Sequence, residues 1–167
     1  MFPFSFLYGS IAALRNIFFD KGWFESRTYD LPIICVGNLS TGGTGKSPLI
    51  EFLITLLSDE YRVAVLSRGY KRKTKGFQEV NLESTVYEVG DEPLQFKQNF
   101  PKVTIAVCAD RREGIERLKS KADVILLDDA FQHRRVKASI NILLTSFKDL
   151  YCNDWYKLWY WSFDQLQ

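Results

Sequence analysis

The sequence predicts an α/β fold in which helices cover both faces of a parallel sheet. From residue 32 onward, short apolar runs alternate with stretches that have helical periodicity. The apolar runs are continuous, as expected for strands that are buried on both faces. The chain has 167 residues, of which 46% are hydrophobic and 25% charged, and this supports one globular domain with its own core.

The elements of this domain, which we place at residues 29–150, follow one another in strand–helix order. We expect strands at the apolar runs Ile33–Val36, Arg62–Leu66, Val103–Cys108, Asp123–Asp129 and Ile140–Thr145. We expect helices at Ser47–Asp59, where Pro48 is tolerated in the first turn, and from about Arg111 to Ser120. A basic loop, Ser67–Phe77, follows the second predicted strand.

Residues 1–28 form a separate predicted segment. Residues 1–14 carry no charged side chain, but a bilayer-spanning helix needs about 20 apolar residues. Apolar residues recur at helical spacing, at Phe4, Leu7, Tyr8, Ile11, Leu14 and Phe18. We therefore predict an amphipathic helix, and the pattern alone fits packing on the domain as well as a membrane surface. Residues 151–167 form an aromatic tail.

Charge and cysteine content exclude some classes of protein. The formal net charge of +2 is small, which argues against a nucleic-acid partner. The three cysteines, Cys35, Cys108 and Cys152, are scattered, with no Cys-x-x-Cys pair. We expect them to be free thiols in a reducing compartment.

A glycine-rich stretch, STGGTGKS at Ser40–Ser47, lies between the first predicted strand and the first predicted helix. This is the context of a phosphate-binding P-loop, in which backbone N–H groups and the helix N-terminus face the phosphates. The lysine of such a loop reaches the outer phosphates and the hydroxyl binds Mg²⁺. One departure is that the first glycine of the general pattern falls on Ser40. The expected phosphate-binding residues are Gly42, Gly43, Thr44, Gly45, Lys46 and Ser47.

Two pairs of carboxylates are candidates for metal binding or catalysis beside this loop. Asp128 and Asp129 end an apolar strand, where a P-loop enzyme places the acids that organise Mg²⁺. Asp91 and Glu92 form the second pair. The stretch GDEP is also a good helix start, so helix capping and a role for Asp91 as the base that takes a hydroxyl proton both stay open.

Other polar residues lie at predicted strand ends or turns. The basic loop contains Arg68, Lys71 and Arg72, at the sheet edge where α/β proteins bind ligands, and it fits either an anionic partner or a solvated surface. Arg111 begins a helix after another strand and is a candidate phosphate contact. His133, the only histidine, follows Asp128 and Asp129 by a short turn and is either a ligand contact or an ordinary polar turn residue.

Five motifs in order resemble one family, the tetraacyldisaccharide 4'-kinases of lipid A biosynthesis. They are VGNLSTGGTGKSP, LSRGYKRKTKGF, GDEPLQ, DRREG and LLDDAFQHR. The resemblance runs from Phe4 to about Thr145, and the N-terminal FSFLYGSIAALRNIFFDKG is also similar. Five motifs in register are far more specific than the P-loop alone.

The resemblance implies a P-loop fold and ATP- and Mg²⁺-dependent phosphorylation of the 4'-hydroxyl of a tetraacyldisaccharide 1-phosphate. It implies a peripheral enzyme on the cytoplasmic face of the bacterial inner membrane, held there by the N-terminal helix. It also implies that Asp91 is catalytic with Lys46, and that Ser47, Glu92, Asp128 and Asp129 lie on the metal side. Arg68, Lys71, Arg72, Arg111 and His133 are then candidate contacts for the substrate.

Members of this family are longer, and the tail from about Lys157 does not resemble them. We therefore expect an apparently truncated N-terminal half, by truncation or a shifted reading frame, and a non-catalytic nucleotide-binding remnant is the alternative function. A P-loop GTPase is a poor match, because Ser146–Asp149 departs from the guanine motif and DDAF lacks the glycine of Asp-x-x-Gly.

Overall fold

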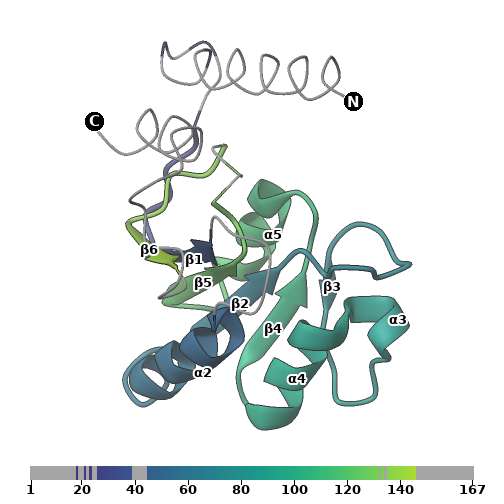
Figure 1. Cartoon of the computed structure of the whole chain (residues 1–167). Coiled ribbons are helices and arrows are strands. Elements are labelled where there is room, and N and C mark those ends of the chain that lie inside the picture. Colours follow the sequence, from purple (N-terminus) through teal and green to yellow (C-terminus); the bar gives the residue numbers. More distant parts are fainter. Residues whose placement is uncertain are drawn as a thin grey trace. The chain divides into compact units, whose positions relative to one another are not determined.

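The computed structural model describes residues 18, 21, 23, 26–38, 45–131, 133 and 135–145. The chain divides into two units, Arg27–Leu144 and a second unit made of Met1–Ser26 and Thr145–Gln167. The first unit contains the predicted α/β fold (Figure 1).

Six strands form one sheet in the order β3-β4-β2-β5-β1-β6. The strands are β1 (Ile33–Asn38), β2 (Val63–Ser67), β3 (Gln78–Glu79), β4 (Thr104–Val107), β5 (Val124–Asp128) and β6 (Ile140–Leu144). Every pair is parallel except β3 with β4. Strand β1 lies between β5 and β6, with Ile34 opposite Leu126 on one side and Ile140 on the other.

Among the described residues, four helices flank the sheet: α2 (Lys46–Leu57), α3 (Val86–Val89), α4 (Asp91–Asn99) and α5 (Arg111–Leu118). Residues of α2 and α4, such as Ile54 and Phe96, join one buried cluster, and residues of α5, such as Ile115, join the other. Figure 1 shows α2 and α4 lying together on one side of the strands. The sheet is therefore covered on both faces, as the continuous apolar strands predict.

Strand residues alternate between the two buried clusters. In β1, Ile34 and Val36 face the cluster of α2 and α4, whereas Ile33 and Cys35 face that of α5. The same period of two continues through β2, β4 and β5 because successive side chains of a strand point to opposite faces. The edge strand β6 is more exposed, and Ile140 is 53% exposed.

The structure confirms the five predicted strands and both predicted helices, with ends that shift by one to two residues. The sheet is mostly parallel, as predicted, and the short β3 adds one antiparallel pairing with β4. Strand β3 and helix α3 were not predicted. The free, buried thiols expected at Cys35 and Cys108 are confirmed, while Cys152 lies outside the described residues.

Little of the second unit is described. The rings of Phe18 and Trp23 stack with centroids 5.1 Å apart. The backbone N–H of Trp23 donates to the backbone carbonyl of Phe18. The predicted N-terminal helix and aromatic tail otherwise lie outside the described residues and stay predictions. Among the residues that the structure describes, no helix is long and apolar enough to cross a membrane.

Candidate active site

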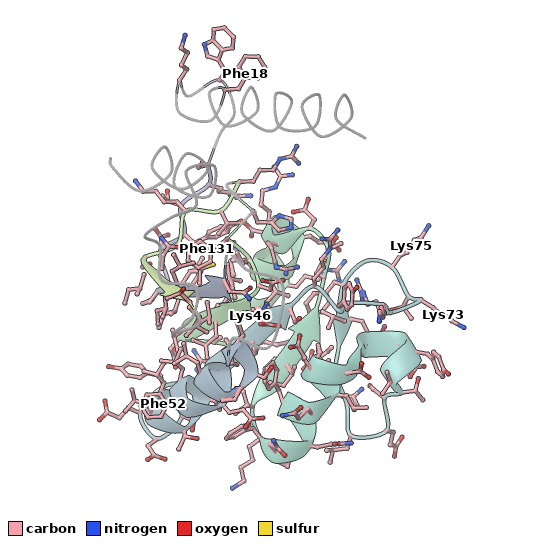
Figure 2. All side chains as sticks on the ribbon, in the orientation of Figure 1. Phe18, Lys46, Phe52, Lys73, Lys75 and Phe131 are labelled. Carbon is pink, nitrogen blue, oxygen red and sulfur yellow. The ribbon has the colours of Figure 1, made fainter. Side chains whose placement is uncertain are left out.

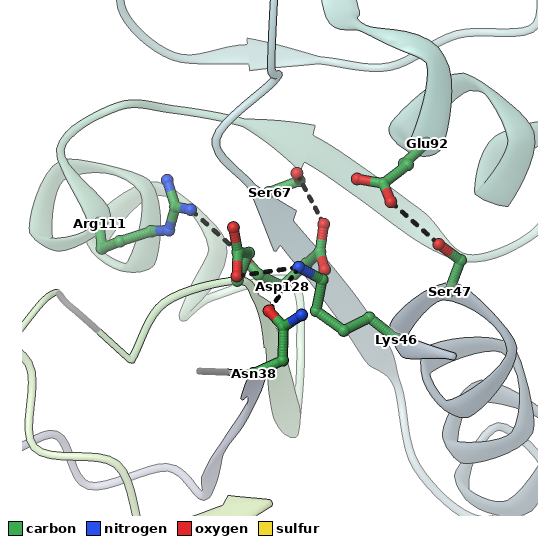
Figure 3. A network of polar contacts seen from close by, with 8 residues as sticks. Asn38, Lys46, Ser47, Ser67, Glu92, Arg111 and Asp128 are labelled. Atoms are coloured by element: carbon green, nitrogen blue, oxygen red, sulfur yellow. Dashed lines mark hydrogen bonds and ion pairs between the residues drawn. The ribbon is translucent and has the colours of Figure 1, made fainter. Parts of the chain in front are cut away.

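Polar side chains gather at one edge of the sheet, where the parallel strands β1, β2, β4 and β5 all end (Figure 3). Carboxyl ends of parallel strands meet at the same edge, and this is where α/β proteins bind ligands. Helix α2 begins there directly after Gly45, whose backbone is left-handed with φ of 84°. The edge therefore combines a helix N-terminus with the predicted acids.

Lys46, the first residue of α2, bridges the ends of β1 and β5. Its ammonium Nζ donates to Asn38 Oδ1 at 2.9 Å and to Asp129 Oδ1 at 3.1 Å. The Lys46 side chain is 18% exposed and that of Asp129 is 59% exposed. An ion pair this open to water is weak, so the lysine is available to exchange its partners for another anion.

Ser47 and Glu92 connect the starts of α2 and α4. The Ser47 hydroxyl donates to Glu92 Oε1 at 3.0 Å, and both residues are half-buried. Helix α4 begins at Asp91, after Gly90 with φ of 93°, so GDEP does start a helix, but the helix capping considered there is wrong because Asp91 and Glu92 lie inside the first turn. No side chain caps this helix, and two acids in its first turn interact favourably with its dipole. Asp91 itself is exposed.

Asp128, the last residue of β5, is buried, with 1% of its surface exposed. Its Oδ2 accepts a hydrogen bond from the Ser67 hydroxyl at 2.9 Å, at the end of β2. Burial, and next the charge of Glu92, raises the pKa of Asp128 to about 6, while Ser67 and Lys46 oppose this shift. The carboxyl group is therefore close to gaining a proton near neutral pH.

Asp129 is adjacent to Asp128 but lies in a different environment. Its backbone is left-handed with φ of 50°, and its N–H donates to the Val36 carbonyl at 3.0 Å. This turn directs one carboxylate into the protein and leaves the other exposed beside Lys46. The repulsion expected between neighbouring acids is thus reduced by separation and by the ammonium.

Arg111 is fully buried at the start of α5. Its guanidinium donates to the carbonyl of Cys108, and Nη2 donates to the carbonyl of Asp128 at 3.1 Å. Burial lowers the pKa of Arg111, partly offset by the nearby Asp128. Its Nε has no hydrogen-bond partner among the described residues. The side chain therefore connects the ends of β4 and β5.

The other predicted residues are more scattered. Arg68 and Lys71 are exposed, and Arg72 donates to the Gly76 carbonyl at 2.6 Å. His133 is half-buried in the turn after β5, where its backbone N–H donates to the Ala130 carbonyl. Their substrate roles stay predictions. Gly42, Gly43 and Thr44 lie outside the described residues.

The structure thus brings Lys46, Ser47, Glu92, Asp128 and Asp129 to one edge, with the exposed Asp91 next to Glu92. Within the described part of the chain, no group of three or more His, Cys, Asp or Glu side chains is arranged to hold a metal ion. Two site residues, Asn38 and Ser67, were missed by the sequence analysis. Each is the last residue of a parallel strand, and that position was the available signal.

Comparison with known proteins decides the family. The sequence model of LpxK, tetraacyldisaccharide-1-P 4'-kinase, matches residues 1–156. The chain belongs to this family. Tetraacyldisaccharide 4'-kinases from Flavobacterium johnsoniae and Bacteroides fragilis are 58% and 54% identical to it, each match covering 92% of this chain.

A solved structure agrees with this tetraacyldisaccharide 4'-kinase assignment. The crystal structure described as the "apo" form of LpxK from Aquifex aeolicus in complex with ATP is 42% identical, with a TM-score of 0.80 over 88% of this chain. The match covers 48% of that chain, and the two sequence matches cover 46% and 42% of the relatives. The chain therefore spans about half the length of the curated relatives it matches.

Proposed function

We propose that this chain binds ATP and carries the nucleotide-binding half of a kinase that phosphorylates the 4'-hydroxyl of a tetraacyldisaccharide 1-phosphate. The observation that supports this most is the position of Lys46, at the start of α2 and between Asn38 and Asp129. The family relationship and the ATP in the Aquifex aeolicus LpxK crystal support the same nucleotide.

Nucleotide binding would exchange the present partners of Lys46. The ammonium leaves the exposed Asp129 carboxylate for phosphate oxygens, which carry more charge. The N–H groups at the start of α2, which have no partners within the helix, face the same phosphates. Asn38 stays as a neutral acceptor that orients the ammonium.

The oxygen donors at this edge suit Mg²⁺, which binds one or two carboxylates and phosphate oxygens and keeps several waters. Ser47, Glu92, Asp128 and Asp129 are the residues that would hold it, although they form no ready three-carboxylate cage. When bound, Mg²⁺ neutralises charge that develops on the transferring phosphate. The Ser47–Glu92 hydrogen bond keeps two of these donors together beforehand.

Asp91 is our candidate for the base that takes the proton of the acceptor hydroxyl. It is exposed in the first turn of α4, adjacent to Glu92, and therefore accessible to a substrate that approaches this edge. A base must come within hydrogen-bond reach of the proton it removes. We expect Asp91→Asn to reduce transfer far more than it reduces ATP binding.

We further propose peripheral association with the cytoplasmic face of the bacterial inner membrane through the segment at residues 1–28. The aromatic helical spacing of that segment supports this location. Deletion of residues 1–19 is expected to reduce association with liposomes, and full retention would exclude the segment as the anchor.

The decisive assay uses the purified chain with radiolabelled ATP, Mg²⁺ and the tetraacyldisaccharide 1-phosphate in detergent. Labelled lipid above the level of a Lys46→Ala control supports transfer by this chain. ATP binding without labelled lipid supports the second candidate, a nucleotide-binding protein without transfer activity. Equal ATP affinity in the wild type and in Lys46→Ala would contradict both candidate functions.

A further inference from the structure

A cluster of lysines and tyrosines lies outside the polar network of the candidate active site, and Lys71 is its only member among the candidate substrate contacts. We call it the basic–aromatic patch: Tyr70, Lys71, Lys73 and Lys75 in the loop between β2 and β3, with Tyr87 from α3. Residues 67–77 contain five basic side chains and no acidic one. The concentration of positive charge here contrasts with a whole-chain net charge of only +2.

The patch is open to solvent. Tyr70 and Tyr87 are 74% and 68% exposed, so both rings are accessible to a binding partner outside this chain. The Lys71 ammonium lies 5.2 Å from the centre of the Tyr70 ring, and that of Lys73 lies 4.8 Å from the Tyr87 ring. Among the described residues, none of the three lysines forms an ion pair.

The loop that carries these side chains is held in place by hydrogen bonds. The Lys73 N–H donates to the Tyr87 carbonyl at 2.8 Å, which joins the loop to α3. The Thr74 hydroxyl donates to the Glu88 carbonyl, and Arg72 donates to the Gly76 carbonyl. The backbone that carries the patch is therefore tied to α3 and belongs to the folded unit.

The loop also contacts the candidate site. A side chain at Gly90 would lie 3.1 Å from the Tyr70 carbonyl and 3.4 Å from Gly69, so the two backbone segments pack closely. Gly90 directly precedes Asp91 and Glu92. The patch is thus fixed to the same body as these acids and begins at the same edge of the sheet.

We propose that the basic–aromatic patch binds the surface of an anionic lipid bilayer. Lysines near such a surface are attracted to lipid phosphates, and tyrosine rings favour the boundary between headgroups and acyl chains. Figure 2 shows Lys73 and Lys75 pointing outward from the loop, so they do not converge on one small anion. The patch consists of other residues than the anchor proposed at residues 1–28, and the binding requires no catalytic activity.

The test measures binding of the full chain, without ATP, to phosphatidylcholine vesicles with and without phosphatidylglycerol. The variant Lys71→Gln/Lys73→Gln/Lys75→Gln replaces three ammonium groups with neutral, polar amides and so removes three charges. Since each lysine near an anionic surface contributes about a fivefold effect, we expect affinity for the anionic vesicles to fall on the order of 100-fold at low salt. The matched control Lys102→Gln/Lys119→Gln/Lys137→Gln removes the same charge elsewhere and is expected to retain most of the binding.

A second variant, Tyr70→Ala/Tyr87→Ala, is expected to weaken binding to both kinds of vesicle while it leaves the salt dependence unchanged. Thermal unfolding checks that each variant folds. Equal losses in the patch and control variants would overturn the proposal, as would a loss of binding to single-stranded DNA with none to vesicles. A chain that neither binds ATP through Lys46 nor transfers phosphate, but still shows the patch-dependent binding, would refute only the proposed function.

Discussion

The candidate site has a buried half and an open half, and the two are built differently. The buried half consists of Ser67, Arg111 and Asp128, each at most 4% exposed. The open half includes Lys46 and Asp129, with side chains 18% and 59% exposed. The arginine of the buried half donates to backbone carbonyls, whereas the Lys46 ammonium donates only to side chains among the described residues.

This difference separates the parts that the fold requires from the parts that a ligand can rearrange. Backbone partners are fixed once the strands have paired, so the buried half forms as part of the fold. Exposed contacts between side chains contribute little free energy and are easily exchanged. We therefore expect substitutions in the buried half to affect the free energy of unfolding, and those in the open half to affect mainly ligand binding.

The largest change in the free energy of unfolding is expected for Arg111→Met. This change leaves the carbonyls of Cys108 and Asp128 without their donors in a buried site. We expect the free energy of unfolding, measured by urea denaturation, to fall by about 4 kcal/mol. The neighbouring Arg112→Met removes an exposed arginine paired with Asp110 and should cost less than about 1 kcal/mol. Similar losses in both variants would remove the distinction between the halves.

The next largest effect is a dependence of the free energy of unfolding on pH, which we attribute to Asp128. Its pKa is about 6 in the folded chain against 3.8 for the unfolded reference, so the folded state binds the proton more tightly. Stability from this group is therefore present below pH 4 and is lost as pH rises toward 6, by up to about 3 kcal/mol. In metal-free buffer, Asp128→Asn should abolish this fall, whereas Asp129→Asn should keep it. If the loss of stability with rising pH persists in Asp128→Asn, another titrating group must cause it.

Ser47→Ala tests the link between α2 and α4. It removes one half-buried hydrogen bond to Glu92, and we expect the free energy of unfolding to fall by about 1 kcal/mol. Thr55→Ala is a suitable control on the same helix, because it removes an exposed hydroxyl that donates to the Glu51 carbonyl. A loss as large as that of Arg111→Met would place Ser47 in the buried half.

The smallest change in stability is expected for Lys46→Met. The substitution keeps the aliphatic stem and breaks an ion pair whose carboxylate is largely exposed, so the free energy of unfolding should change by roughly 0.5 kcal/mol. Calorimetric titration with ATP should nevertheless show a large loss of affinity. A marked loss of stability would mean that the open half is also structural.

The strands that the sequence predicted have a local signal, whereas the missed strand β3 depends on a distant partner. Continuous apolar runs located five strands, because each is buried on both faces. The two-residue β3 exists only by pairing with β4, and no periodicity can reveal an element so short. Helix α3 had a local signal that went unused, the capping box of Thr85 and Glu88.

The same distinction applies to the site. The P-loop lysine and the strand-end acids follow from motif and context, since their chemistry needs these residue types at these positions. The burial of Arg111 was not predictable, because charged residues are usually exposed and its partners are backbone carbonyls on two strands. Asn38 and Ser67 are common polar residues whose importance depends on what lies across the sheet.

The central position of β1 has a consequence for how the chain folds during synthesis. Its partners are β5, where Ile33 lies opposite Ile125, and β6, where Ile34 lies opposite Ile140. Both pairings join residues far apart in the sequence, and such contacts form slowly. On the ribosome, β1 emerges early but has no neighbouring strand until residues 124–144 have followed it. The strand that leads into the phosphate loop is thus among the first parts of the chain to be made and among the last to be fixed.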